Sequence, residues 1–153
     1  YHLQGCNLRC PWCSNPEVLA FRGGEDCSID ALVDEVLRSR LMFFEGGGVT
    51  LTGGEATMQL EQAKEFFTRL QAESVHTCME TNGIHPRLPE LFPVLDLLIM
   101  DVKHHDPAIH AAVTGLPNHF TLENIEAAKK VGYVGIQFFG YEDAKVKLEA
   151  MLG

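Results

Sequence analysis

The stretch GCNLRCPWCSNPE, residues 5–17, places Cys6, Cys10 and Cys13 within eight residues on one short segment. A closed structural zinc site needs four ligands, generally as two separated pairs. The next thiol, Cys27, stands fourteen residues beyond Cys13 with no partner beside it. Three thiolates on one loop instead suit a 4Fe–4S cluster, which has four irons and usually four thiolate ligands. One iron then keeps an open position that a substrate or cofactor can occupy.

The composition is that of an ordinary globular domain. The 153 residues suit one domain with a core of its own, and 46% of them are hydrophobic and 22% charged. The formal net charge of −9 argues against a general nucleic-acid or anionic-membrane surface, because both need clustered Lys and Arg. No apolar run approaches the roughly 18 residues of a membrane span, and no signal peptide is visible. We therefore expect a cytoplasmic protein, in which clustered cysteines are metal ligands or catalytic thiols rather than disulfides.

The rest of the chain alternates between two kinds of segment. Strands are predicted at 47–54, 75–83, 95–104 and 131–139, and Tyr1-His2-Leu3-Gln4 has the character of the end of another strand. Helical periodicity is found at 28–41, where Ser28 is a candidate N-cap, and at 57–71, 121–130 and 142–152. In the first of these helices the apolar positions are Ile29, Leu32, Val33, Val36, Leu37 and Leu41. This alternation predicts an α/β fold built from βα units around a parallel sheet.

Polar clusters follow the strands, at the point where each strand ends. GCNLRC follows the first strand, TGGE the second, ETNG the third and DVKH the fourth. In parallel α/β folds the carboxyl ends of the strands open on one edge of the sheet, where sites collect. We therefore expect the four clusters to face one common space.

These motifs together carry a family resemblance. C-x3-C-x2-C after a first strand, with Trp12 before the last cysteine and Gly53-Gly54-Glu55 after a later strand, resembles the radical S-adenosylmethionine (SAM) enzymes. The segments GGGVTLTGGEATMQL, ETNG, LLIMDVKHHDP and TLENI, with H-x3-TG-x2-N at 110–118, are similar to one branch. That branch comprises the activating enzymes of glycyl radical enzymes, of the pyruvate formate-lyase activase type. The resemblance extends over residues 1 to 130.

The resemblance implies an incomplete (β/α)6 barrel of the TIM-like kind, in a single radical SAM domain over residues 1–153. The chain begins without Met, and after Gly132 it departs from the family pattern, with no Arg strand followed by a Pro-Gly loop. We therefore expect the domain to lack its N-terminal start and part of its C-terminal strands.

The resemblance also implies an anaerobic radical oxidoreductase. In this family the amino and carboxylate groups of SAM chelate the open iron of the reduced cluster, and cleavage of SAM supplies a 5′-deoxyadenosyl radical. The radical abstracts a hydrogen atom from a glycine of a glycyl radical enzyme. That enzyme is the expected protein partner, with an electron donor such as flavodoxin or ferredoxin, and neither a nucleic acid nor a membrane is expected.

The resemblance also implies which residues of this sequence form the site, where they match the family's motifs position by position. The metal ligands would be Cys6, Cys10 and Cys13, with zinc ligation or plain buried thiols as the alternatives. The cofactor-binding residues would be Trp12, Ser14, Gly53, Gly54, Glu55, Glu80, Thr81, Asp101, Val102 and Lys103. No protein side chain is expected to be catalytic beyond the cluster and the cofactor. Glu80 stands where the family more often has Asp, which leaves open whether a monovalent cation sits beside the SAM carboxylate.

The remaining cysteines and the histidines give weaker indications of function. We expect Cys78 to lie in the core of a strand and Cys27 to have no role, so that a single cluster is predicted. His104 and His105, placed on a strand, would point to opposite faces and make a poor joint ligand set. His110 and Asn118 match family positions, without a role that follows from the sequence.

Two other classes of function stay open. One is a radical SAM enzyme that acts on a small molecule or on ribonucleotide reductase. The other is a non-catalytic iron–sulfur or zinc-binding module that uses the same loop. Among glycyl radical enzymes, the sequence does not distinguish a formate-lyase from a diol dehydratase or an amine-lyase.

Overall fold

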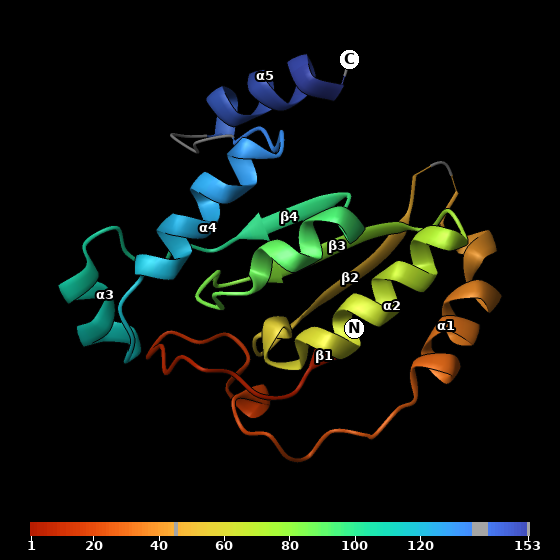
Figure 1. Cartoon of the computed structure of the whole chain (residues 1–153), viewed down its shortest axis with the longest axis horizontal. Coiled ribbons are helices and arrows are strands. Elements are labelled where there is room, and N and C mark those ends of the chain that lie inside the picture. The colour runs from red at the N-terminus through yellow and green to blue at the C-terminus, as the bar shows by residue number, and fades with distance from the viewer. Residues whose placement is uncertain (45, 136–140, 153) are drawn as a thin grey trace.

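One parallel sheet organises the chain. The computed structural model describes residues 1–44, 46–135 and 141–152. The strands are β1 (His2–Leu3), β2 (Gly48–Gly53), β3 (His76–Thr81) and β4 (Leu97–Met100), and they lie in the order β1-β2-β3-β4. All three pairings are parallel, so each strand is joined to the next by a crossover. This confirms the α/β class, and the open sheet is consistent with a partial barrel (Figure 1).

Helices and short 3-10 turns fill the crossovers. The helices are α1 (Ile29–Arg38), α2 (Leu60–Ala72), α3 (Pro107–Thr114), α4 (His119–Lys130) and α5 (Tyr141–Leu152). The 3-10 segments are η1 (Pro16–Val18), η2 (Arg40–Met42), η3 (Ala56–Gln59) and η4 (Leu88–Val94). The Ser28 side chain accepts a hydrogen bond from the Ala31 backbone N–H at 3.2 Å, which confirms it as the N-cap of α1. The helices predicted at 28–41, 57–71, 121–130 and 142–152 correspond to α1, α2, α4 and α5. The helix α4 begins two residues earlier than predicted.

The helix α3 was not predicted from periodicity, although its ends carry clear signals. Asp106 caps it, because its carboxylate accepts from the backbone N–H groups of Ala108 and Ile109 at 2.9 and 3.0 Å. Pro107 occupies the first turn, and Gly115 ends the helix in the left-handed region at φ 96°. A capping Asp, a following Pro and a terminal Gly are the usual boundaries of a helix.

The two faces of the sheet differ in what covers them. Alternation along the strands sends Val49, Leu51 and Met79 to one face, where they join the main hydrophobic core. The helical residues of that core come from α1, α2, η3, η4 and α4, and they include Phe66, Phe67, Leu70, Leu88, Leu91 and Phe92. The opposite face carries Glu80 and its register partner Ile99, which is 45% exposed. The helical segments of this core thus lie along one side of the sheet, as Figure 1 shows for α1 and α2.

Two details of the sequence prediction are wrong. Leu41 was expected on the buried face of the first helix, but α1 ends at Arg38 and Leu41 is 93% exposed. In the strand predicted over 131–139, residues 131–135 form a turn and irregular backbone instead. Residues 136–139 of that prediction lie outside the described residues.

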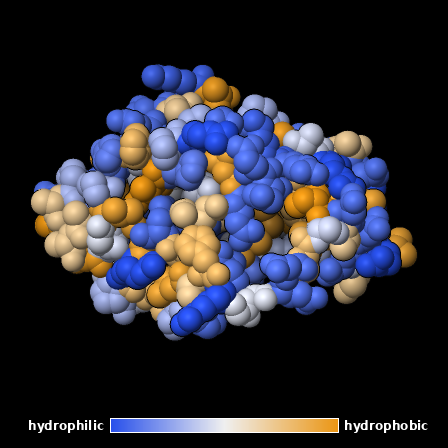
Figure 2. Space-filling model, turned by 60° about the horizontal axis from the view of Figure 1, so that its bottom comes forward, coloured by the Kyte–Doolittle hydropathy of each residue, from blue (hydrophilic) through white to orange (hydrophobic). Residues whose placement is uncertain are grey.

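The surface is mixed in character. On the face shown in Figure 2, hydrophilic residues are interspersed with smaller groups of hydrophobic ones. Among the described residues, none of the helices combines the length and the apolar character that a membrane span requires.

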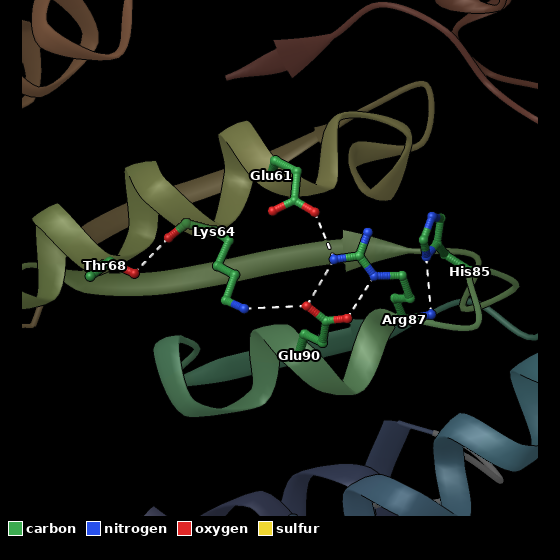
Figure 3. A network of polar contacts seen from close by, with 6 residues as sticks. All are labelled: Glu61, Lys64, Thr68, His85, Arg87 and Glu90. Atoms are coloured by element: carbon green, nitrogen blue, oxygen red, sulfur yellow. Dashed lines mark hydrogen bonds and ion pairs between the residues drawn. The ribbon is translucent and has the colours of Figure 1, made fainter.

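A network of charged side chains joins α2 to η4 on the surface. The Arg87 guanidinium donates to Glu61 on α2 and to Glu90 on η4, both at 2.6 Å, and Lys64 contacts Glu90 at 3.3 Å (Figure 3). The hydrogen bonds from Arg87 and Lys64 lower the pKa of Glu90 to about 2. Hydrogen bonds to Glu90 and Glu61 raise the pKa of Arg87. The network is exposed to solvent, so we expect it to be weak and sensitive to salt.

Candidate cofactor site

A cavity of about 870 Å³ lies at the carboxyl edge of the sheet, near the end to which the strand arrows point in Figure 1. The four clusters expected to share one space all line it. From the N-terminal loop come Cys6, Leu8, Cys10, Trp12, Cys13, Ser14, Asn15 and Leu19. From the ends of β2, β3 and β4 come Thr52, Gly53, Gly54, Glu55, Glu80, Thr81, Asn82, Ile99, Met100, Asp101, Val102 and Lys103. The structure therefore brings together every residue that the sequence assigned to the site.

The loop that carries the three cysteines is anchored at both of its ends and near its middle. At its base the backbone N–H of Gly5 donates to the Val18 carbonyl at 2.8 Å. The Arg9 backbone N–H donates to the carbonyl of Thr114 in α3, also at 2.8 Å. The Arg9 side chain folds back and donates to the carbonyl of Cys6 at 2.7 Å. The loop is thus held by hydrogen bonds within itself and by one to α3.

The three thiols differ in exposure. Cys6 is buried and packs with Leu8 and Ile84 in a small apolar cluster, whereas Cys10 and Cys13 are half-buried. Burial raises the pKa of the Cys6 and Cys10 thiols. For Cys10 the positive charge of Lys103 acts in the opposite direction and favours the thiolate.

The donor set fits a multi-iron cluster better than a single ion. In the part of the chain that the structure describes, no three His, Cys, Asp or Glu side chains are placed to hold one metal ion together. A cubane cluster has a different requirement, because each thiolate binds an iron of its own. Cys6, Cys10 and Cys13 line one cavity from one loop, as such a cluster would need.

Gly53 and Gly54, at the end of β2, line the cavity, and the local backbone geometry also requires glycine at both positions. Gly53 has a φ of 103°, in the left-handed region that favours glycine. A Cβ on Gly54 would lie 2.2 Å from the carbonyl oxygen of Gly5 and 2.9 Å from that of Val18. The end of β2 therefore packs backbone to backbone against the cysteine loop. The Glu55 N–H strengthens this contact, since it donates to the Gly5 carbonyl at 2.8 Å.

The Glu55 carboxylate is the centre of a buried network. It is 1% exposed, and its Oε1 accepts from the Thr57 N–H at 3.0 Å, the Thr57 hydroxyl at 2.5 Å and the Thr81 hydroxyl at 2.6 Å. Its Oε2 accepts from the Asn82 N–H at 2.7 Å. Four donors satisfy the carboxylate, so Glu55 links the end of β2 to the end of β3.

Acidic and basic side chains face the cavity from β3 and β4. The Thr52 hydroxyl donates to Glu80 at 2.6 Å, which holds that carboxylate across the β2–β3 pair. Lys103 forms an ion pair with Asp101 beyond the end of β4. Trp12 lines the cavity and is 53% exposed, so it is not a core tryptophan.

Two residues of α4 that the sequence analysis did not assign to the site bind the backbone of the segment after β3. The Thr121 hydroxyl donates to the Asn82 carbonyl at 3.0 Å. The Asn124 amide donates to the carbonyls of Gly83 and His85 at 2.8 and 2.9 Å. Both side chains are buried, and both belong to the TLENI segment of the resemblance. That motif was the one signal in the sequence that could have identified them.

The histidines do not behave as predicted. His104 and His105 were expected on a strand and on opposite faces, but β4 ends at Met100 and they lie in the following loop. Their rings stack at a centroid distance of 4.8 Å. Asn118 holds this loop by donating to both of their carbonyls, at 2.7 and 2.9 Å. His110 is buried within α3, with its Nδ1 2.5 Å from the carbonyl oxygen of Leu116.

The remaining cysteines agree with the prediction in their placement. Cys78 is buried within β3, and Cys27 is exposed. Neither lines the cavity.

Comparison with known proteins gives consistent matches. The profile of the Radical SAM superfamily matches residues 1–141. The pyruvate formate-lyase 1-activating enzyme of Escherichia coli K12 is 39% identical over 125 residues, which cover 78% of this chain and 51% of that protein. The pyruvate formate-lyase-activating enzymes of Staphylococcus epidermidis and Staphylococcus aureus are 35% and 34% identical, over 78% and 75% of this chain. The chain spans about half the length of these curated relatives.

Proposed function

Because the chain belongs to the radical SAM superfamily, we propose that it forms the cofactor-binding part of a radical SAM activase that acts on a glycyl radical enzyme. One observation carries the proposal. The cysteine motif and the ends of β2, β3 and β4, which are far apart in the sequence, line a single cavity. The names of the similar proteins support the choice of an activating enzyme within the superfamily.

The cysteine loop would hold a 4Fe–4S cluster through Cys6, Cys10 and Cys13. When bound, the cluster and SAM together supply a 5′-deoxyadenosyl radical that takes a hydrogen atom from a glycine of the partner. All three cysteines line the cavity, and Cys6 is also part of the apolar cluster with Leu8 and Ile84, against which Cys10 packs.

The ends of β2 and β4 would bind and orient SAM. The backbone of Gly53 and Gly54 offers the surface for its amino group. Asp101 and Lys103, which pair with each other, can exchange partners so that the ammonium group of Lys103 meets the SAM carboxylate. Val102 and Trp12 would exclude water from the apolar parts of the cofactor.

Glu80 has a different task from the Asp that the family more often shows. Its carboxylate is already bonded to the Thr52 hydroxyl at 2.6 Å. We infer that Glu80 positions the wall of the cavity, through β2, rather than holding a cation alone.

The test begins with anaerobic reconstitution of the chain with iron and sulfide. The reduced protein is mixed with SAM, and 5′-deoxyadenosine is measured by chromatography. We expect the nucleoside to form with the wild type and to vanish with Cys10→Ala. Cys27→Ala is the matched control, because Cys27 is exposed and lies outside the cavity.

A second measurement addresses the partner. Pyruvate formate-lyase, the enzyme that the relatives are named for activating, is added, and a glycyl radical is sought by electron paramagnetic resonance. A cluster that forms without any release of 5′-deoxyadenosine would contradict the activase and favour a non-catalytic iron–sulfur module. Release of the nucleoside without a glycyl radical would favour another substrate.

A further inference from the structure

We propose that Asn7 and Asn82 form a positioning pair that fixes the Cys6 half of the cysteine loop against the end of β3 before the cluster binds. The inference rests on the proposed function, because it concerns the cluster that this loop would hold. It assigns a role to two polar side chains that bind neither iron nor SAM in that proposal.

The contact between the two residues is direct. The Asn82 side-chain amide donates to Oδ1 of Asn7 at 2.8 Å. Asn7 adjoins Cys6, whose Sγ lies 3.9 Å from the same oxygen. Among the described residues, this is the one side-chain hydrogen bond between the loop 5–19 and the segment 76–85. It therefore connects the first cysteine to the sheet.

Asn82 can act as an anchor because its backbone N–H, its carbonyl and its side-chain oxygen all form hydrogen bonds of their own. It is 7% exposed, and its side-chain oxygen accepts from the Ile84 N–H at 3.0 Å, which fixes the rotamer. Its backbone N–H donates to Glu55, and its carbonyl accepts from the Thr121 hydroxyl. The side-chain NH2 group of Asn82 is directed at Asn7.

An apolar contact beside the Asn7–Asn82 hydrogen bond also holds Cys6 against the segment after β3. Cys6 and Leu8 pack on Ile84, which follows Asn82 by two residues. Cys10 is half-buried and packs against the same apolar cluster, whereas Cys13 is half-buried and does not belong to it. Cys6 is thus the ligand that lies beside both the Asn7–Asn82 hydrogen bond and the contact with Ile84. We infer that these two contacts place Cys6 before the iron–sulfur cluster binds.

The test compares Asn7→Leu with Asn7→Asp. Asn7→Leu has a similar shape but cannot accept the bond from Asn82, whereas Asn7→Asp keeps an acceptor oxygen. Hydrogen–deuterium exchange of the cluster-free protein is measured for peptides covering residues 5–10, with a peptide over 76–81 as the internal reference. We expect exchange in 5–10 to rise by about three- to tenfold in Asn7→Leu and to return to the wild-type rate in Asn7→Asp.

Thr121→Val is the matched control. It removes a buried hydrogen bond to the same Asn82, but on the side away from the loop. We expect it to leave exchange in 5–10 unchanged. Equal exchange in 5–10 for Asn7→Leu and the wild type would overturn the inference, as would a parallel rise in 76–81, because the effect would then be general unfolding.

A second readout connects the pair to the cluster. After reconstitution, the loss of the iron–sulfur absorbance to a chelator is followed over time. We expect Asn7→Leu to lose the cluster about three- to tenfold faster than Asn7→Asp. Loss at the same rate in both would overturn the role toward the cluster. A wild-type protein that takes up no iron would contradict the proposed function instead, and the exchange rates would still decide whether the tether exists.

Discussion

Glu55 and Glu90 each join elements that are distant in sequence, but they do so in opposite surroundings. Glu55 is 1% exposed and accepts from four uncharged donors on Thr57, Thr81 and Asn82. Glu90 lies on the surface between two cations, Arg87 and Lys64. The first network supports the cavity wall, and the second fastens α2 to η4. We therefore expect the number of charges to be a poor guide to how much a network stabilises the fold.

The physical reason is the solvent. A buried donor that loses its acceptor keeps the full cost of leaving water, so each bond to Glu55 matters when the carboxylate is removed. An exposed ion pair exchanges its partner for water and is screened by salt, and most such pairs contribute little.

Replacing Glu55 by Leu should have the largest effect. It leaves four buried donors without an acceptor, and we expect the free energy of unfolding to fall by about 3 kcal/mol or more. Urea unfolding followed by circular dichroism measures the change. Glu90→Leu is the matched control, and similar losses in the two variants would refute the contrast between the networks.

Replacing Asn124 by Leu should have an intermediate effect. The carbonyls of Gly83 and His85 would lose their buried donor, and we expect a loss of about 2 kcal/mol in the free energy of unfolding. The same urea experiment applies. The neighbouring exposed residue provides the control, and a Glu123→Leu variant that loses as much would show that the two buried bonds are unimportant.

Replacing Arg87 by Met should have a small effect that depends on salt. The change breaks both carboxylate contacts of the surface network but keeps much of the length of the side chain. We expect a slightly lower midpoint of thermal unfolding at low salt. The difference from the wild type should disappear at about 1 M salt, where the Debye length is ~3 Å. A difference that persists unchanged at high salt would contradict a screened network.

The pH dependence should give the smallest signal. The pKa of Glu90 is lowered from an ordinary value of 4.5 to about 2 by Arg87 and Lys64. A lowered pKa in the folded state adds stability above pH 4.5, and this is lost as the pH falls towards 2. We therefore expect wild type to lose stability more steeply than Glu90→Gln over that window. Parallel acid-unfolding curves for the two proteins would count against the assignment.

The arrangement of the fold and the place of the site could be predicted because both depend on local patterns. Helical spacing of Phe66, Phe67 and Leu70 is visible in the sequence, and so is the capping Ser28. The rule that parallel strands open on one edge then brings Gly53, Glu80 and Asp101 together without further information. Their positions in the cavity wall follow from that rule, whereas their roles toward SAM remain predictions.

What could not be predicted depends on side chains that meet across long separations in the sequence. The TLENI motif marks Asn124 as a residue of interest, but it does not indicate that the amide binds the carbonyls after β3, about forty residues earlier. The stacking of His104 on His105 was missed for a related reason, since the exact end of β4 decides whether the two rings share a face. Strand ends are set by hydrogen bonding between strands and not by local composition.

The position of β1 has a consequence for the order in which the molecule assembles. Its two residues pair with β2, and His2 lies opposite Thr52, fifty positions later in the chain. The carbonyl of Gly5 likewise accepts a hydrogen bond from the N–H of Glu55, fifty residues later. During synthesis the cysteines therefore leave the ribosome long before the strand that shapes their loop. The hydrogen bond between Gly5 and Val18 needs no other strand, whereas the contacts of the loop with β2 can form only after β2 has been synthesised. We therefore expect the loop to be fixed against the sheet late in folding.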